Sequence, residues 1–317
     1  MTKSLVTGGA GFIGYHLTKY LITKGHEVTI LDNFSDYYSE KIKRTNAKEL
    51  QQLGVNVVEG SILQREDLQN AITDQCEYVF HFAAQPGVRY STMNPERSLR
   101  INVEGTSHVL SICKEVGIRK IVVASSSSVF GLQEYLPIDE THPKNPISYY
   151  GASKLATEKI VEVSRHLYND LDISIVRPFT VIGARQRPDM AINLFISRAL
   201  KETPIIIYGD GKQTRDWTHV ENIVEGTYLM AVKSGGRNED FNIGSGIRTS
   251  VNDVLEMISE ITSKKLKIEY KPFDKADVKD TLADISKAKE LLDYSPKKSL
   301  KIAIEDFIKD YQETNLY

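Results

Sequence analysis

The sequence predicts an α/β fold, a doubly wound parallel sheet followed by a smaller mixed α/β lobe. Short runs rich in Val and Ile alternate with helical patterns as far as residue 177, and a glycine-rich turn joins the first strand to the first helix. Continuous apolar strands separated by helices are typical of a parallel sheet that is buried on both faces. The first lobe is therefore expected to have helices on both sides of its sheet.

The first lobe, residues 1–177, is expected to contain strands and helices in regular alternation. Apolar side chains at Ile13, Leu17, Tyr20 and Leu21 have the spacing of one helical face, which predicts a helix over residues 12–24. The further predicted helices are 39–53, 66–72, 94–116 and 148–168, and the predicted strands are 5–6, 28–31, 55–58, 78–82, 120–124 and 173–176.

After Pro178, glycine and proline turn signals become more frequent. Helices are expected again at residues 251–262, 285–292 and 303–311. We therefore expect a second domain over residues 178–317 that binds a substrate, with part of residues 213–243 returning to the first sheet.

Composition excludes several classes of protein. The chain has 317 residues, of which 41% are hydrophobic and 26% charged, with a net charge of −2, as expected for two globular lobes. A net charge of this size and sign argues against general binding of nucleic acid or of anionic membranes. The two cysteines, Cys76 and Cys113, form no CxxC pair, so we expect no metal site. The apolar runs are too short for a membrane-spanning helix. Without a signal-peptide pattern, a cytoplasmic location is expected.

The glycine-rich turn has the pattern of a dinucleotide-binding loop. Thr7–Gly14 reads TGGAGFIG, with Gly8, Gly11 and Gly14 between a strand and a helix. Such glycines permit a tight turn and close approach of a pyrophosphate to the helix N-terminus. Asp32 follows 18 residues after Gly14, where a carboxylate accepts hydrogen bonds from the ribose and repels a 2′-phosphate. The cofactor is therefore expected to be NAD.

A second pattern places a phenol and an ammonium group on one helical face. Tyr150 and Lys154 are four residues apart, and the lysine cation is expected to lower the pKa of the tyrosine. Such a tyrosine could take a proton from a sugar hydroxyl. The serine run 125–128 ends a predicted strand, at the edge of the sheet where ligands bind, and Ser126 is the serine expected to assist catalysis.

Several stretches together resemble the extended short-chain dehydrogenase/reductases, and more narrowly the NAD-dependent nucleotide-sugar epimerase/dehydratase family. They are TGGAGFIG, Asp32, HFAA at 81–84, SSSSVFG at 125–131, YGASK at 150–154 and RDWTHV at 215–220. The resemblance implies a Rossmann lobe with tightly held NAD, a C-terminal lobe for the nucleotide sugar, and a homodimer. It implies NAD contacts at Gly8, Gly11, Phe12, Ile13, Gly14, Asp32, Asn33, Ser61, Ile62, Phe82, Ala83, Ala84, Asn102, Ser125, Tyr150, Lys154 and Pro178.

Within this family, the residues favour C4 epimerisation of a UDP-sugar through a 4-keto intermediate. Dehydratases and decarboxylases of the family carry carboxylates in the segment that here reads Ser126, Ser127 and Ser128. Arg187, with Arg185 or Arg89, offers a planar fork for a sugar carboxylate. Together with Thr180, it resembles UDP-glucuronate 4-epimerases, although a solvated loop or phosphate contact is the alternative for these arginines. Substrate contacts are expected at Arg89, Ser126, Ser127, Ser128, Tyr150, Thr180, Arg185, Arg187, Asn193, Leu194, Ile207, Tyr208, Gln213 and Arg215.

The chain departs from the family pattern at three places, and other functions stay open. Ser61 stands where relatives have Asp, Phe130 replaces Tyr, and a phosphate-binding arginine segment is absent, for which Lys271 or Lys275 is a poor substitute. The alternatives are a UDP-glucose or UDP-N-acetylglucosamine 4-epimerase, a decarboxylase or dehydratase, and a non-catalytic NAD-sensing protein. His81 and His219 are interpreted as hydrogen-bonded strand residues rather than metal ligands.

Overall fold

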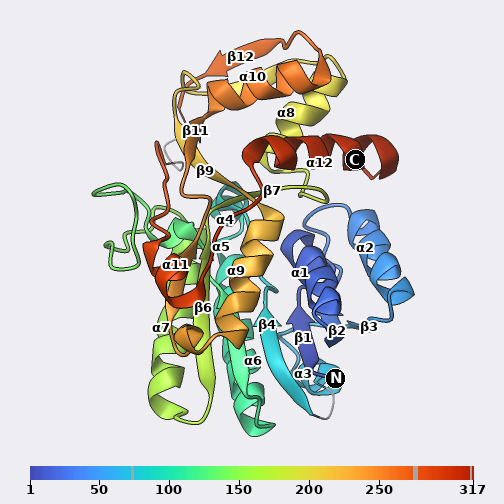
Figure 1. Ribbon diagram of the computed structural model, residues 1–317, viewed down its shortest axis with the longest axis vertical. Helices are drawn as coiled ribbons and strands as arrows, with labels where there is room; N and C mark the ends of the chain where they lie inside the picture. Colours follow the sequence, from blue (N-terminus) through green and yellow to red (C-terminus); the bar gives the residue numbers. More distant parts are fainter. Residues whose placement is uncertain (73–74, 274–277, 315) are drawn as a thin grey trace.

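The computed structural model describes residues 1–72, 75–273, 278–314 and 316–317. Its main element is a seven-stranded, entirely parallel sheet with the order β10-β6-β5-β4-β1-β2-β3 (Figure 1). The strands are β1 (Lys3–Thr7), β2 (Glu27–Asp32), β3 (Asn56–Glu59), β4 (Cys76–His81), β5 (Lys120–Ala124), β6 (Asp172–Pro178) and β10 (Asp240–Ile243). The predicted parallel sheet is therefore confirmed.

Helices cover both faces of this sheet, because its central strands bury side chains on both sides. One apolar core contains side chains of α1 (Phe12–Thr23), α2 (Glu40–Gln52), α9 (Val220–Val232) and α11 (Ser286–Leu292). A second core contains side chains of α3 (Arg65–Ala71), α6 (Gly105–Glu115) and α7 (Tyr149–Leu167). All five residues of β5 are buried, as a strand between two helical layers requires. This is the doubly wound Rossmann architecture that the sequence predicts.

The long helix predicted over residues 94–116 is confirmed as a continuous helical segment over residues 95–115 that contains a π-helical turn. It consists of α5 (Pro95–Leu99), the π-helical turn η1 (Arg100–Glu104) and α6, and the short helix α4 (Val88–Met93) precedes it. A π turn often marks a functional position in a helix. Here it contains Asn102, whose amide oxygen accepts a hydrogen bond from the backbone N–H of Gln85 at 2.7 Å. The turn thus supports the loop that follows β4.

The second lobe is a mixed α/β unit at the top of Figure 1. It contains a three-stranded sheet of β7 (Thr180–Ile182), β9 (Thr214–His219) and β11 (Arg248–Ser250), and a pair formed by β8 (Ile205–Tyr208) and β12 (Ile268–Lys271). The helices α8 (Ala191–Leu200), α10 (Val251–Thr262) and α12 (Leu300–Thr314) surround its apolar core, which includes Trp217. Two short 3-10 turns are η2 (Ser127–Val129) and η3 (Ser234–Gly236).

The chain crosses between the lobes more than once. After β9, α9 packs on the first sheet and β10 extends it beside β6, before β11 returns to the second lobe. Within the described ranges, no helix has both the length and the apolar character needed to cross a membrane.

Candidate active site

A cavity of about 920 Å³ lies where the carboxyl ends of β1, β2, β4, β5 and β6 face the second lobe. Ligands of doubly wound folds bind at this edge of the sheet. Most of the predicted contact residues line it: Gly8, Gly11, Phe12, Ile13, Gly14, Asp32, Asn33, Ser61, Ile62, Phe82, Ala83, Ala84, Arg89, Ser125, Ser126, Ser127, Ser128, Tyr150, Lys154, Pro178, Thr180, Arg187, Leu194, Ile207, Tyr208, Gln213 and Arg215.

The glycine-rich loop forms a cradle with no room for side chains. Gly8 has φ +70°, and a Cβ there would lie 2.7 Å from the backbone nitrogen of Ala83. A Cβ at Gly14 would meet the carbonyl oxygen of Gly8. α1 begins after Gly11, and no side chain caps its first turn. Its N-terminus therefore presents amide N–H groups to the cavity, which suits a pyrophosphate.

Asp32 ends β2 and organises the loops on both sides of it. Its carboxylate accepts hydrogen bonds from the backbone N–H groups of Ala10 at 3.1 Å and Phe34 at 2.9 Å. Burial raises the pKa of Asp32, and these two hydrogen bonds oppose that rise. A carboxylate in this position fits a ribose diol, so the cradle, the helix N-terminus and Asp32 together fit a dinucleotide.

Tyr150 lies in the first turn of α7, with its hydroxyl close to Ser126 and Arg187. Ser148 caps the helix by accepting a hydrogen bond from Gly151 N–H at 3.0 Å. The expected lowering of the Tyr150 pKa is not found: burial raises the pKa, while a hydrogen bond with Ser126 and the charge of Arg187 oppose the rise. Loss of hydration at this position, which a local sequence pattern does not show, raises the pKa instead.

Lys154 is buried one helical turn further along α7. Its ammonium group donates a hydrogen bond to the carbonyl oxygen of Ala124 at 2.8 Å, at the end of β5. Burial lowers the pKa of Lys154 to about 8, and the charge of Glu158 opposes this shift. The lysine is therefore held in place by the sheet and charged below that pH.

The four serines after β5 have different partners. The hydroxyl of Ser125 donates to Glu158 at 2.6 Å, and the hydroxyl of Ser126 donates to Ser128 at 3.2 Å.

Glu158 is the centre of a buried group of ion pairs behind these serines. Arg177 donates two hydrogen bonds to Glu158, at 2.7 and 3.0 Å, and Lys144 pairs with Glu158 at 2.8 Å. Burial opposes these partners, but together they lower the pKa of Glu158 to about 2. A buried ion-pair network thus supports this wall of the cavity.

Arg187 enters the cavity from the loop after β7. Its Nε and Nη2 donate to the two carboxylate oxygens of Asp189 at 2.9 and 3.1 Å. The Tyr37 hydroxyl donates to the same carboxylate at 2.8 Å. Tyr37 belongs to the loop after β2, so residues of both lobes meet here.

Three predicted contact residues lie outside the cavity lining. Arg185 is buried against α2 and α12, where its Nε donates to Asp310 at 2.8 Å and its Nη2 to Glu49 at 2.9 Å. Asn193 donates to the carbonyl oxygen of Gln186 at 2.9 Å, and Asn102 acts through Gln85 rather than at the cavity. The prediction for Arg185 is therefore corrected: its guanidinium group forms ion pairs with two carboxylates of the protein.

Only one of the two lysines considered for phosphate binding lies among the described residues. Lys271 ends β12 with an exposed side chain and does not line the cavity, and Lys275 lies outside the described residues. Arg215 lines it, and its Nη2 donates to the carbonyl oxygen of Val278 at 2.6 Å.

Several lining residues were missed by the sequence argument. Tyr37, Tyr38 and Lys43 follow β2, Tyr90 belongs to α4, and Asp189 lies beside Arg187. The position of Tyr37 and Tyr38, directly after the carboxyl end of a parallel strand, is the signal that could have identified them.

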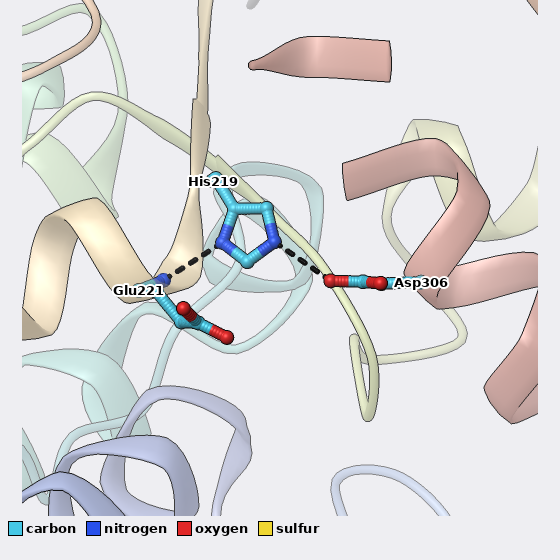
Figure 2. A group of neighbouring side chains, drawn as sticks. All are labelled: His219, Glu221 and Asp306. Atoms are coloured by element: carbon cyan, nitrogen blue, oxygen red, sulfur yellow. Dashed lines mark hydrogen bonds and ion pairs between the residues drawn. The ribbon is translucent and has the colours of Figure 1, made fainter. Parts of the chain in front are cut away.

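Both histidines are hydrogen-bonded strand residues, as interpreted from the sequence. His81 contacts Thr7 at 2.7 Å and Thr106 at 3.0 Å, and burial lowers its pKa to about 3. Figure 2 shows His219 between the backbone N–H of Glu221, which donates to Nδ1 at 3.0 Å, and the carboxylate of Asp306, 3.0 Å from Nε2. His219 thus joins β9 and the start of α9 to α12.

Known proteins resemble this chain over nearly its whole length. The family model described as GDP-mannose 4,6 dehydratase matches residues 5–307. A UDP-glucuronate 4-epimerase of Thermodesulfobacterium geofontis is 39% identical over 308 residues, covering 96% of this chain and 93% of the relative. A putative UDP-glucose 4-epimerase of Methanocaldococcus jannaschii is 38% identical, covering 98% of this chain and 99% of the relative.

A solved structure also resembles this chain over its full length. The UDP-glucuronic acid 4-epimerase of Bacillus cereus, in complex with UDP-glucuronic acid and NAD, is 33% identical with a TM-score of 0.92, and each chain is covered completely. With this match added to the family model and the relatives, the chain belongs to the GDP-mannose 4,6 dehydratase family, among the NAD-dependent nucleotide-sugar epimerases and dehydratases.

Proposed function

We propose that this protein is an NAD-dependent 4-epimerase that interconverts UDP-glucuronate and UDP-galacturonate. The observation that carries the proposal is the meeting of Tyr150, Ser126 and Arg187 in the lining of one cavity. A phenol and a guanidinium at one site suit a substrate that loses a hydroxyl proton and carries a carboxylate.

Tyr150 is the general base in this proposal. Its deprotonated phenolate oxygen takes the proton of the sugar 4-hydroxyl, and Ser126 lines the same cavity. A bound NAD supplies the hydride acceptor at C4 and a positive charge that favours the phenolate. Lys154, fixed to the carbonyl of Ala124, adds a second positive charge on the same helical face.

The wall that carries Ser126, Ser127 and Ser128 offers hydroxyls and no carboxylate. A dehydratase needs an additional acid and base to eliminate water, so a wall of hydroxyls favours an outcome without elimination. A 4-keto sugar that turned over in the cavity and took back its hydride would have C4 inverted.

Arg187 is the proposed partner of the sugar carboxylate. A 4-keto uronic acid is a β-keto acid that loses carbon dioxide readily, and a bidentate hydrogen bond fixes the carboxylate against that loss. UDP-glucose is the second candidate substrate, because the relative from M. jannaschii, named a putative UDP-glucose 4-epimerase, has nearly the same identity to this chain.

We further propose that residues 1–177 with part of 213–243 hold the cofactor, and that residues 178–317 hold the nucleotide sugar. The remaining contact assignments made from the sequence stay predictions, as does the cytoplasmic location.

A homodimer is proposed from one face of α7. Tyr149, Val163 and Leu167 are 50%, 57% and 62% exposed, and they lie on one stripe of the helix with Ala152, Ala156 and Ile160. An apolar stripe with this spacing is typical of a helix that packs against another helix.

The proposed reaction is tested by following UDP-glucuronate, UDP-glucose and UDP-N-acetylglucosamine by NMR in parallel with the purified protein and no added NAD. We expect UDP-galacturonate from UDP-glucuronate. A pentose product would identify a decarboxylase, and conversion of only the neutral sugars would identify a hexose epimerase. Accumulation of NADH in proportion to product would identify a dehydrogenase, and no conversion of any sugar would favour a non-catalytic protein.

A further inference from the structure

Arg187 uses only one edge of its guanidinium group within the protein. Nε and Nη2 bond the two oxygens of Asp189 side by side, which occupies the edge that these two nitrogens share. The opposite edge, formed by Nη1 and the second hydrogen of Nη2, donates no hydrogen bond to any residue that the structure describes. A guanidinium has five N–H donors, so this second edge can bind another carboxylate in the same bidentate manner.

Asp189 is itself held from the opposite lobe. The hydroxyl of Tyr37 donates to Oδ2 of Asp189 at 2.8 Å, and the two residues are 152 positions apart in the sequence. The Tyr37 ring packs edge-to-face on Tyr90 with 4.8 Å between ring centroids. The Arg187 Cζ lies 5.7 Å from the centroid of the Tyr37 ring. Asp189 thus has a fixed position between an aromatic pair and the arginine.

The loop that carries both charges is also fixed from behind. Arg185 donates through its backbone N–H and its Nε to the carboxylate of Asp310 on α12, at 2.9 and 2.8 Å. The backbone two residues before Arg187 is therefore tied to the second lobe. An arginine side chain has many rotamers, and the remaining freedom of Arg187 is restricted by its pair with Asp189.

We propose that Asp189 is a positioning residue for substrate specificity: it binds one edge of Arg187 so that the other edge faces the cavity and binds the carboxylate of a uronic acid sugar. The inference rests on the proposed function. Tyr37 supports Asp189 from the first lobe. The substrate carboxylate binds without displacing Asp189, because the two carboxylates use different edges of the guanidinium.

The test compares two ligands that differ only at C6. Dissociation constants for UDP-glucuronate and UDP-glucose are measured by calorimetry on the purified holoprotein, and kcat and KM are measured for UDP-glucuronate. The variants are Asp189→Asn, Tyr37→Phe and Arg187→Ala. Asp293→Asn is the control, because it breaks an ion pair, with Lys233 at 2.6 Å, whose residues lie outside the cavity lining.

We expect Asp189→Asn to weaken the binding of UDP-glucuronate about tenfold and the binding of UDP-glucose about twofold or less. The reason is that one charge-assisted hydrogen bond to Arg187 is lost. KM for UDP-glucuronate should rise more than kcat falls. Tyr37→Phe should give a smaller loss of affinity with the same selectivity, and Asp293→Asn should change the affinity for neither ligand.

Other results overturn the proposal in distinguishable ways. Equal losses for both ligands would mean that Asp189 only maintains the fold, and tighter UDP-glucuronate binding would mean that it competes with the substrate. If Arg187→Ala weakens the binding of UDP-glucuronate more than that of UDP-glucose but Asp189→Asn does not, the role of Asp189 fails and the proposed function stands. If Arg187→Ala weakens both ligands equally, recognition of the carboxylate fails, and the positioning role fails with it.

Discussion

The ammonium group of Lys154 donates its hydrogen bond to the carbonyl oxygen of Ala124, 2.8 Å away at the end of β5. This bond ties α7 to β5, an interior strand of the sheet, beside the cavity. The same helix carries Tyr150 one turn earlier and Glu158 one turn later, so three ionisable groups lie along one helix at the edge of the sheet.

The rise of kcat/KM with pH is expected to level off near pH 8. The proposed reaction needs Tyr150 as a phenolate and Lys154 as an ammonium group. Burial raises the pKa of Tyr150, so its phenolate fraction grows with pH throughout the neutral range. Burial lowers the pKa of Lys154 to about 8, so its charged fraction falls above that pH and offsets the growth. Lys154→Met should remove this break in the profile along with most of the activity; an unchanged break would assign it to another group.

Tyr150→Phe should reduce turnover by at least about 10²-fold, the usual scale for a lost general base, while NAD remains bound. The control is Tyr149→Phe, since Tyr149 is the adjacent tyrosine of the same helix and is half-exposed at the surface. Turnover is measured with UDP-glucuronate, and bound NAD by extraction and absorbance. Near-normal turnover of Tyr150→Phe would refute its role as the base.

Glu158→Gln should destabilise the protein by about 3 kcal/mol, because the buried charge of Arg177 would lose its buried partner and keep only its pair with the partly exposed Asp240. In the native protein the pKa of Glu158 is lowered to about 2, so its contribution is present above the ordinary value of 4.5 and is lost as pH falls toward 2. Urea unfolding at pH 7 and at pH 3 measures both effects.

The matched control for this variant is Glu162→Gln, one turn further along α7. Glu162 pairs with Lys159 at 2.8 Å, and both side chains are exposed, so its loss should change the free energy of unfolding by about 1 kcal/mol or less. Equal losses of unfolding free energy in the two variants would contradict the expectation that the buried ion pairs contribute more to stability than the exposed pair.

Asp32→Asn should weaken NAD binding and relax discrimination against NADP. The carboxylate accepts two backbone hydrogen bonds and places a negative charge where a 2′-phosphate would lie. Titration of both dinucleotides into protein freed of cofactor should show the NAD preference falling by about tenfold or more, because a like-charge contact is removed. An unchanged preference would place discrimination elsewhere.

Val163→Arg should convert a dimer to a monomer if α7 forms the proposed subunit contact, since an arginine in an apolar helix interface is left without a partner. Sedimentation velocity measures the mass directly. Val116→Arg, at a similarly exposed valine outside α7, is the control. A wild-type protein that sediments as a monomer, or a dimer that survives the substitution, would contradict the proposal.

Local sequence predicted the parts of the site that depend on short-range geometry. Gly8, Gly11 and Gly14 form the expected cradle because the backbone must turn tightly between a strand and a helix, whatever the rest of the chain does. Tyr150 and Lys154 share a helical face for the same reason. These features follow from helical and turn geometry, which neighbouring residues determine.

The two arginines of the loop after β7 could not be separated in this way. Arg185 and Arg187 are two residues apart, yet Arg185 is buried against Glu49 and Asp310 while Arg187 enters the cavity with Asp189. Their difference depends on carboxylates contributed by α2 and α12, far away in the sequence. Likewise, the π-helical turn contains Asn102, which makes two hydrogen bonds to the backbone of Gln85, a contact that the local sequence pattern does not predict.

The sequence by itself determined the alternation of strands and helices, the glycine cradle and the pairing of phenol and ammonium, because periodicity and turn chemistry are local. Tertiary structure alone decided the pKa of Tyr150, which of the two arginines reaches the cavity, and the contact between Tyr37 and Asp189. Burial and long-range charge pairing depend on which distant segments pack together, and neither is contained in a local pattern of residues.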